Sequence, residues 1–178
     1  MRIGYLTSKA ITTGFTLYWL VFWLFNGLDK FLNRSTLGGI TWFGKDRSWQ
    51  FGVYMENLGL PLDFVPGILT FAGIWELLIA ILFLSALNIT IVAGEREQDA
   101  ADRIFIIGLF VSALTFIGFC AFDTVVGDRA ELLEHSTYMA VIAVSYICMA
   151  VENVIKRQNA TSISVLDHHA VNAQPPTE

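Results

Sequence analysis

The sequence predicts an all-α integral membrane protein, a four-transmembrane-helix up-down bundle, and three observations support that class. Hydrophobic residues make up 54% of the 178-residue chain and charged residues only 15%, an uncommon balance for a soluble domain. The apolar residues form four long blocks, each close to the ~20 residues that a helix needs to cross a bilayer. Most charged side chains lie between the blocks. We therefore expect a membrane domain over residues 1–156 and a polar tail over 157–178.

The first span is expected over residues 11–31 and closes with three polar residues. Basic residues precede it as in a signal peptide, but the apolar stretch is long and aromatic and lacks an A-x-A cleavage site, so we expect the span to be retained. Asn26, Asp29 and Lys30 are spaced i, i+3 and i+4 and should share one helix face.

A long loop, rich in glycine and aromatic residues, separates the first two spans. Within it we expect a short interfacial helix over about residues 46–58, because its apolar residues recur at helical spacing. That stripe comprises Phe51, Tyr54, Met55 and Leu58. Arg47 and Gln50 fall on other faces of the helix. Such a helix would cap one end of the bundle.

The remaining spans are expected over residues 64–93, 103–126 and 130–156. Pro66 suits the first turn of the second span, where a missing N–H costs nothing. A short charged hairpin over residues 94–102 joins the second span to the third. The tail after residue 156 is polar and holds two prolines, so it should lack fixed structure unless a partner holds it.

Up-down folding would bring the end of the first span, the start of the second, the end of the third and the start of the fourth to one membrane face. One half of the bundle would then collect these residues: Asn26, Asp29, Lys30, Glu76, Asp123, Glu131, Glu134 and His135. The interior of the other half would keep little beyond Thr16, Ser85, Asn88 and Ser145. Ionisable side chains within a span are costly unless paired, and they often mark a site. Glu76 is the deepest of them.

Several of these residues also have a structural interpretation. Lys30 can extend its ammonium to the membrane surface. Asp29 and Asp123 can form salt bridges that fix the packing of the helices. Glu131 and Glu134 lie in the first turn of a helix, where the helix dipole stabilises a negative charge without any further role. His135 can likewise be a hydrogen-bonded packing residue.

Three of the residues suggest chemistry. A cluster of Glu76, Asp123 and His135 can exchange protons with the head group of a lipid-soluble ligand such as a quinone, or form hydrogen bonds to it. Aromatic walls for such a ring are available from Trp19, Phe22, Trp23 and Trp75.

Other site classes are not expected. Glu134 and His135 are adjacent on a helix and diverge by about 100°, so we expect no metal centre. With three histidines, two of them in the tail, the chain alone should bind no haem. A net charge of −5 and 11 scattered basic residues exclude a nucleic-acid surface.

Three short motifs carry a resemblance to a known family. They are NGLDKF at residues 26–31, ENLGLP at 56–61 and GIWELL at 73–78. Together they resemble the DoxX-like integral membrane proteins, whose first helix ends in a Gly-x-x-Lys/His-Phe-like motif and whose second helix carries Gly-x-x-Glu. The resemblance covers about residues 14–90. This chain lacks the arginine often found early in the first helix of that family, and its loop between the first two spans is longer.

The resemblance implies a four-helix protein of a bacterial or archaeal cell membrane, in a family that includes small subunits of thiosulfate:quinone oxidoreductase. Lys30 and Glu76 are the matching positions. We expect a small subunit of a larger redox or energy-converting membrane complex, in contact with lipids and other subunits, which packs helices and contributes a wall of a quinone or lipid site. The termini should be cytoplasmic. The alternatives are a stand-alone enzyme that uses Glu76, Asp123 and His135 on a lipid-soluble substrate and, third, a proton or ion carrier.

Overall fold

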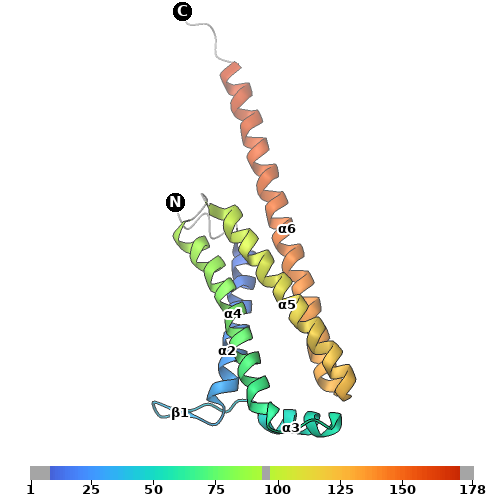
Figure 1. Cartoon of the computed structure of the whole chain (residues 1–178). Helices are drawn as coiled ribbons and strands as arrows, with labels where there is room; N and C mark the ends of the chain where they lie inside the picture. Colours follow the sequence, from blue (N-terminus) through green and yellow to red (C-terminus); the bar gives the residue numbers. More distant parts are fainter. Residues whose placement is uncertain (1–8, 94–96, 173–178) are drawn as a thin grey trace, which may run out of the picture.

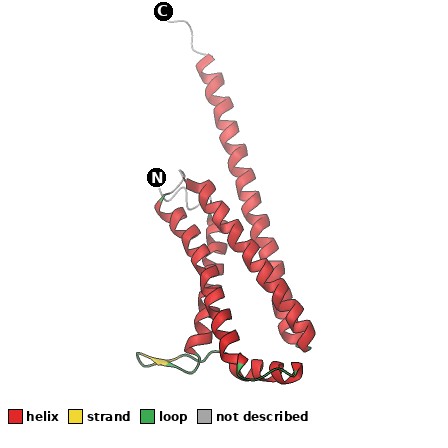
Figure 2. Ribbon diagram, viewed as in Figure 1, coloured by secondary structure: helices red, strands yellow, loops and turns green. Residues whose placement is uncertain are grey.

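The computed structural model describes residues 9–93 and 97–172, with side chains described as far as residue 159. This part of the chain is almost entirely helical (Figures 1 and 2). Its helices are α2 (Ala10–Leu32), α3 (Arg47–Leu58), α4 (Phe64–Val92), α5 (Gln98–Val126) and α6 (Arg129–Asn172), and its strands are β1 (Thr36–Leu37) and β2 (Ile40–Thr41).

Four of these helices are long and apolar enough to cross a membrane. They are α2, α4, α5 and α6 as far as Asn159, and each carries a strongly apolar 18-residue window. Fewer than half of the residues in those windows are buried within the protein, so most apolar side chains face outward. Outward-facing apolar side chains suit a lipid environment. The prediction of a helical protein with four membrane-spanning helices is confirmed at this level.

The long helices pack beside their neighbours in sequence. α2 contacts α4, α4 contacts α5, α5 contacts α6, and α6 returns to contact α2. Figure 1 shows that the end of α2, the start of α4, the end of α5 and the start of α6 all lie toward the end of the molecule that carries α3. The polar residues near those helix termini are therefore brought into the same region.

An aromatic core fills the middle of the four helices. Trp19, Trp23, Phe83 and Phe116 are each at most 1% exposed and belong to one cluster. The two indole N–H groups donate to serine hydroxyls on other helices, Trp19 to Ser145 at 3.0 Å and Trp23 to Ser112 at 2.9 Å. Buried indoles usually find such a partner. The indole N–H groups of the core are thus hydrogen-bonded within the protein.

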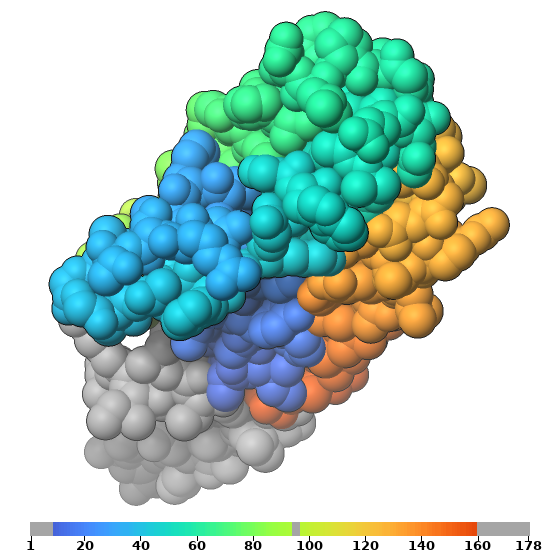
Figure 3. All heavy atoms as spheres, turned by 90° about the horizontal axis from the view of Figure 1, so that it is seen from below, coloured from blue at the N-terminus to red at the C-terminus, as the bar shows by residue number. Residues whose placement is uncertain are grey.

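α3 and the β1–β2 hairpin cover the end of the bundle at which α2 finishes. α3 runs crosswise to the long helices and contacts α4 and α5 (Figures 1 and 3). Asp46 caps it by accepting a hydrogen bond from the Trp49 N–H at 3.1 Å, and Gly59 ends it in the left-handed conformation. The hairpin turns through Gly38 and Gly39, both at positive φ, which is why two glycines are needed there.

Two helix boundaries differ from the sequence prediction. α5 begins at Gln98 and so includes residues 98–102, which were expected in the charged hairpin. Residues 94–96 of that expected hairpin lie outside the described part of the chain. α6 continues to Asn172, beyond its expected end near Lys156. No proline or glycine occurs between residues 157 and 172, so nothing in the sequence stops the helix before Pro175 and Pro176. Polarity of the tail was a poor guide because a solvated helix can be polar on every side.

The end of the bundle opposite α3 is more polar than the sequence indicated. Lys9 is 2% exposed, and its ammonium lies 3.0 Å from Asp102 and 2.5 Å from Asn153. Glu152 accepts the Ile11 N–H at 2.9 Å and hydrogen bonds from the backbone and hydroxyl of Thr12. We call Lys9, Thr12, Asp102, Glu152 and Asn153 the opposite-end cluster. It joins the starts of α2 and α5 to the middle of α6.

Candidate functional site

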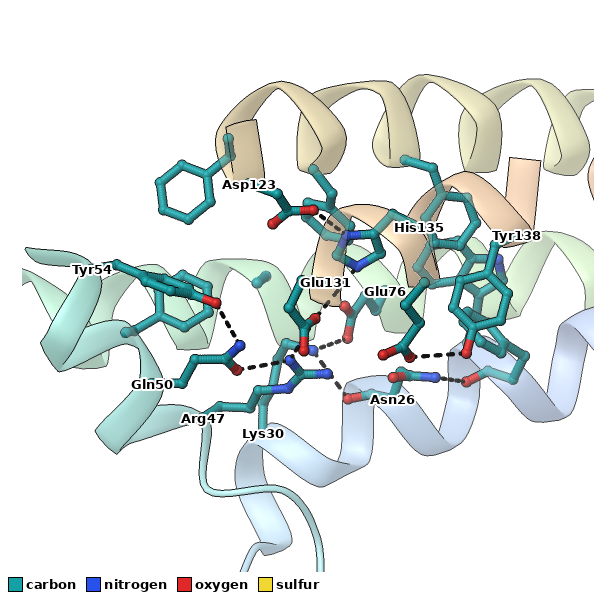
Figure 4. Close-up of a pocket in the computed structure, with 18 residues that line it drawn as sticks. Asn26, Lys30, Arg47, Gln50, Tyr54, Glu76, Asp123, Glu131, His135 and Tyr138 are labelled. Atoms are coloured by element: carbon teal, nitrogen blue, oxygen red, sulfur yellow. Dashed lines mark hydrogen bonds and ion pairs between the residues drawn. The ribbon is translucent and has the colours of Figure 1, made fainter. Parts of the chain in front are cut away.

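A pocket of about 70 Å³ lies inside the bundle, on the side of α3, and residues from five helices line it (Figure 4). We call it the charged pocket. Its lining combines aromatic rings with acidic and basic side chains: Phe22, Trp23, Asn26, Lys30, Arg47, Gln50, Phe51, Tyr54, Ala72, Glu76, Phe116, Phe119, Phe122, Asp123, Glu131, Glu134, His135 and Tyr138. So many charges in a pocket walled by rings are characteristic of a site that holds a polar group in apolar surroundings.

Lys30 and Glu76 form a buried ion pair between α2 and α4. The ammonium lies 2.5 Å from Glu76 Oε2, and the two side chains are 8% and 4% exposed. Side chains on a helix point back toward its N-terminus, so Lys30 reaches inward, where it also donates to the Asn26 carbonyl at 3.3 Å. Lys30 therefore does not extend to the membrane surface, and the interpretation of it as a snorkelling residue is wrong.

Two glycines let α2 and α4 approach closely beside this pair. A Cβ on Gly27 would lie 2.9 Å from Leu77 and 3.1 Å from the Gly73 carbonyl oxygen. A Cβ on Gly73 would lie 2.6 Å from the Phe31 ring. No larger residue fits either place without moving a neighbour, and small residues at such contacts are the usual means of close packing in membranes. The short distance between helix backbones allows Lys30 to span the gap.

On the other side of the pocket, His135 on α6 pairs with Asp123 on α5. Nδ1 lies 2.6 Å from Asp123 Oδ2, so the ring donates its Nδ1–H to the carboxylate. Nε2 points toward Glu131, whose Oε2 is 3.9 Å away (Figure 4). A carboxylate that accepts from one ring nitrogen fixes the orientation of the ring and leaves the other nitrogen available for proton exchange.

Glu131 connects the histidine to α3 and the loop before it. It is 5% exposed and accepts from the Lys45 ammonium and from Arg47 at 3.2 Å. Arg47 also donates to Gln50 at 2.9 Å. The helix-dipole interpretation of Glu131 is therefore too simple, because this carboxylate joins two cations and faces His135. Burial of Lys45, followed by repulsion from Arg47, lowers the pKa of its ammonium below its ordinary value.

Tyr54 completes the network on the α3 side. Its hydroxyl accepts from the Gln50 amide at 2.5 Å and donates to Asp128 Oδ2 at 2.5 Å. Burial, reinforced by the bond to Asp128, raises the pKa of the Tyr54 phenol. The same hydroxyl lowers the pKa of the Asp128 carboxyl. One chain of polar contacts thus crosses the pocket. It runs from Asp128 through Tyr54, Gln50, Arg47, Glu131 and His135 to Asp123.

Five of the six site residues predicted from the sequence line the charged pocket: Asn26, Lys30, Glu76, Asp123 and His135. Asp29 does not. Its carboxylate accepts from the Trp42 indole at 2.7 Å and from the Lys45 backbone N–H at 3.2 Å, so it anchors the loop outside the bundle. The prediction that Asp29 lies in the site with Lys30 on one helix face is wrong, because adjacent residues of a helix point in directions about 100° apart.

The aromatic residues that line the charged pocket differ in part from the four predicted from the sequence. Phe22 and Trp23 line the pocket as predicted, whereas Trp19 is fully buried in the core below it. Trp75 faces outward and donates its indole N–H to Thr115 at 2.9 Å. The structure adds six other aromatic residues to the wall: Phe51, Tyr54, Phe116, Phe119, Phe122 and Tyr138.

Sequence reasoning missed the contribution of Arg47, Gln50 and Tyr54, and it placed Glu131 in the polar half of the bundle without a role beyond the helix dipole. The i, i+4 spacing of Glu131 and His135 is the signal that was available, since residues so spaced share a helix face. For α3 the apolar stripe predicted the wrong buried face, because it left out Gln50. That side chain is only 8% exposed and is as buried as its apolar neighbours. Among the described residues, no group of three His, Cys, Asp or Glu side chains is arranged to hold a metal ion.

The arrangement offers cations and anions in matched pairs. Lys30 and His135 can donate hydrogen bonds to carbonyl or hydroxyl oxygens of a ligand, and Glu76 and Glu131 can accept them. Comparison with known proteins adds no relative: no family model, curated protein or solved structure matches this chain.

Proposed function

We propose that this protein is a four-helix integral membrane subunit of a larger redox or energy-converting complex, and that its charged pocket binds the polar head of a lipid-soluble ligand of the quinone class. In this proposal the long helices run up and down through the bilayer and α3 lies along the membrane surface. The motif resemblance to DoxX-like proteins supports a bacterial or archaeal cell membrane and contacts to lipids and other subunits. Cytoplasmic termini are proposed because the connection between the second and third spans is short and the aromatic loop between the first two suits the opposite face.

The observation that carries the proposal is the placing of two acid–base pairs on opposite sides of one small aromatic pocket. Lys30 with Glu76 and His135 with Asp123 both line it, and each pair contains a carboxylate at most 4% exposed. Helix packing alone is served more cheaply by apolar residues, because taking charges out of water is costly. A polar ligand head between the two pairs would form hydrogen bonds with those charged groups, which explains why they are buried there.

The chemistry that a quinone head requires is available in this pocket. Its two carbonyl oxygens accept hydrogen bonds, for which Lys30 and, when the His135 ring is protonated on both nitrogens, its Nε2–H are suitable donors from opposite sides. Ring stacking against Phe22, Phe116 or Tyr138 would hold the plane of the head. On reduction the oxygens take up protons, which Glu76 and the His135–Asp123 pair can relay.

One observation favours a second candidate, a stand-alone membrane enzyme acting on a lipid-soluble substrate. The Asp123–His135 pair, with Nε2 directed into the pocket, has the geometry of an oriented general base. In that candidate Glu76 would serve as the acid. The third candidate, an ion carrier, is less well supported, because the aromatic core around Trp19 and Phe83 fills the space between the two polar ends.

The test is purification of the tagged protein from its native membrane in mild detergent, followed by mass spectrometry of the proteins and small molecules that accompany it. The proposal expects stoichiometric larger subunits and a bound quinone. Glu76→Gln should lose the quinone and keep the subunits. A protein that purifies alone and turns over a lipid-soluble substrate, with activity abolished in Glu76→Gln, would instead establish the enzyme. Absence of both partner and quinone contradicts the proposal.

A further inference from the structure

A second hollow, an apolar groove of about 460 Å³, lies beside the charged pocket and is formed by α3, α4 and α5. Its lining has only two side chains with nitrogen or oxygen atoms, Trp75 and Thr115. These bond to each other at 2.9 Å, and the Thr115 hydroxyl donates to the Val111 carbonyl at 2.8 Å. The groove therefore presents no unused polar group, and its chemistry suits a hydrocarbon chain.

The groove and the charged pocket adjoin each other. Four residues line both: Phe51, Ala72, Phe119 and Phe122. Ala72 precedes Glu76 by four residues on α4, which is about 6 Å along the helix axis. Glu76 in the charged pocket and the inner end of the groove at Ala72 are therefore about one helical turn apart.

The outer side of the groove is open to the surroundings of the helices. Phe71 is 71% exposed, Leu114 52% and Trp75 40%. On membrane-spanning helices such residues face lipid. The groove thus leads from the lipid, between α4 and α5, to the aromatic wall of the charged pocket.

We infer that the groove seats the apolar tail of the ligand whose head occupies the charged pocket, so that the ligand is a long-chain alkyl or prenyl amphiphile that enters sideways from the bilayer. The inference rests on the proposed function and names the substrate class of that same site. The charged pocket, of about 70 Å³, is suited to a head alone, and the adjoining groove, of about 460 Å³, has room for a chain.

The groove selects by shape and route and contributes little hydrophobic free energy. Lipid chains are as apolar as the groove, so moving a tail from bilayer to groove changes little water-exposed area. A tail that cannot enter the groove while its head is bound must bend out of the site. Blocking the groove should therefore weaken binding of a tailed ligand and leave a tailless head unaffected.

Gly118 and Gly14 provide a matched pair of variants. A Cβ added at either glycine meets nothing within 4 Å, and both lie on exposed faces of long helices. Gly118 lines the groove and not the charged pocket, whereas Gly14 lines a different hollow on α2, which shares Phe22 with the charged pocket and no residue with the groove. Gly118→Phe should fill the groove, and Gly14→Phe should add the same ring elsewhere on the lipid-facing surface.

The experiment measures binding of two quinones, a tailless benzoquinone and the same ring with a decyl tail, to the purified protein in phosphatidylcholine nanodiscs. Gly118→Phe should weaken binding of the decyl quinone about tenfold or more and change binding of the tailless one less than about twofold, because the added ring excludes the tail from the groove and leaves the head site unchanged. Gly14→Phe should change neither. A photoreactive group at the end of the tail should label peptides of α4 and α5 near Trp75 and Leu114.

The outcomes separate the two proposals. If the wild-type protein binds neither quinone, the proposed function fails and the inference with it. If both quinones bind and Gly118→Phe affects them equally, or has no more effect than Gly14→Phe, the head site stands and the groove assignment is overturned. Labelling on another face, or a phospholipid chain that stays in the groove while the decyl quinone is bound, also overturns it.

Discussion

The two polar ends of the helical domain use similar residues in different ways. In the opposite-end cluster the Lys9 ammonium contacts Asp102 and Asn153 directly, and Asn153 also donates to Asp102 at 2.9 Å. No ring-lined cavity separates these groups. In the charged pocket the pairs Lys30–Glu76 and His135–Asp123 stand on opposite sides of an open space. Asp102 and Asn153 also border a surface hollow of about 460 Å³ that no aromatic side chain lines, whereas the charged pocket is walled by aromatic rings.

This difference indicates which buried charges are structural. The polar groups of the opposite-end cluster bond to one another and join three helices, so this cluster fixes helix positions. Paired charges that border a cavity retain donors and acceptors directed toward it. The number of buried charges therefore does not distinguish a ligand site from a set of contacts that fixes the helices. The presence of a ring-lined cavity between the charges does.

The largest expected effect is at the Lys30–Glu76 pair. Lys30→Met leaves a carboxylate that is 4% exposed without its cation and should cost about 3–5 kcal/mol of unfolding free energy. Adding Glu76→Leu removes the stranded charge and should restore most of that stability, but not quinone binding. Thermal unfolding in detergent and quinone titration of both variants check this. A double variant that binds quinone like the wild type would show that this pair is as purely structural as the opposite end.

A smaller effect is expected at the opposite-end cluster. Asp102→Asn removes a charged partner of Lys9 and should lower the unfolding free energy by about 1.5–3 kcal/mol, the usual contribution of a hydrogen bond to a charged group. The Asp102 side chain is more exposed than Glu76, so water compensates part of the loss. Quinone affinity measured in parallel should stay within about twofold of the wild type. A large loss of affinity would mean that the two ends are coupled.

The smallest effect concerns Tyr54 and depends on pH. Asp128 has a lowered pKa because the Tyr54 hydroxyl donates to it, so this contribution to stability is complete above the unfolded-state value of about 4 and is lost as pH falls through the lower folded-state value. The difference in melting temperature between wild type and Tyr54→Phe should be present at pH 6 and shrink below about pH 4. Melting curves across that range test it, and a constant difference would contradict the assigned hydrogen bond.

The sequence predicted the spans well because a membrane sets both the length and the polarity of a helix. It also placed Lys30 and Glu76 together, since both lie near helix ends that meet at one face. The sequence could not show that Asp29 contacts the loop while Lys30 faces the bundle interior. The contact of Asp29 depends on the position of Trp42, which donates to its carboxylate. Lys9 and Asp102 were missed since each stands at a helix end, where water is the ordinary partner.

The orientation of α3 was beyond sequence reasoning for a related reason. An amphipathic pattern shows that a helix has two faces, but not whether the polar face meets water or another polar surface. Here Arg47 and Gln50 turn toward Glu131 and Tyr54, which come from α6 and from α3 itself. Their placement follows from the position of α6, a helix that begins some 80 residues later in the chain.

The close approach of α2 and α4 at Gly27 and Gly73 suggests a rule for building such sites. The sequences Gly-x-x-Lys and Gly-x-x-Glu, set on adjoining helices, bring the two backbones close enough for an ion pair, with the Leu77 and Phe31 side chains packed against the glycines. A designer who wishes to install a charge pair within a synthetic membrane bundle can start from these two motifs together with the two side chains that pack against them.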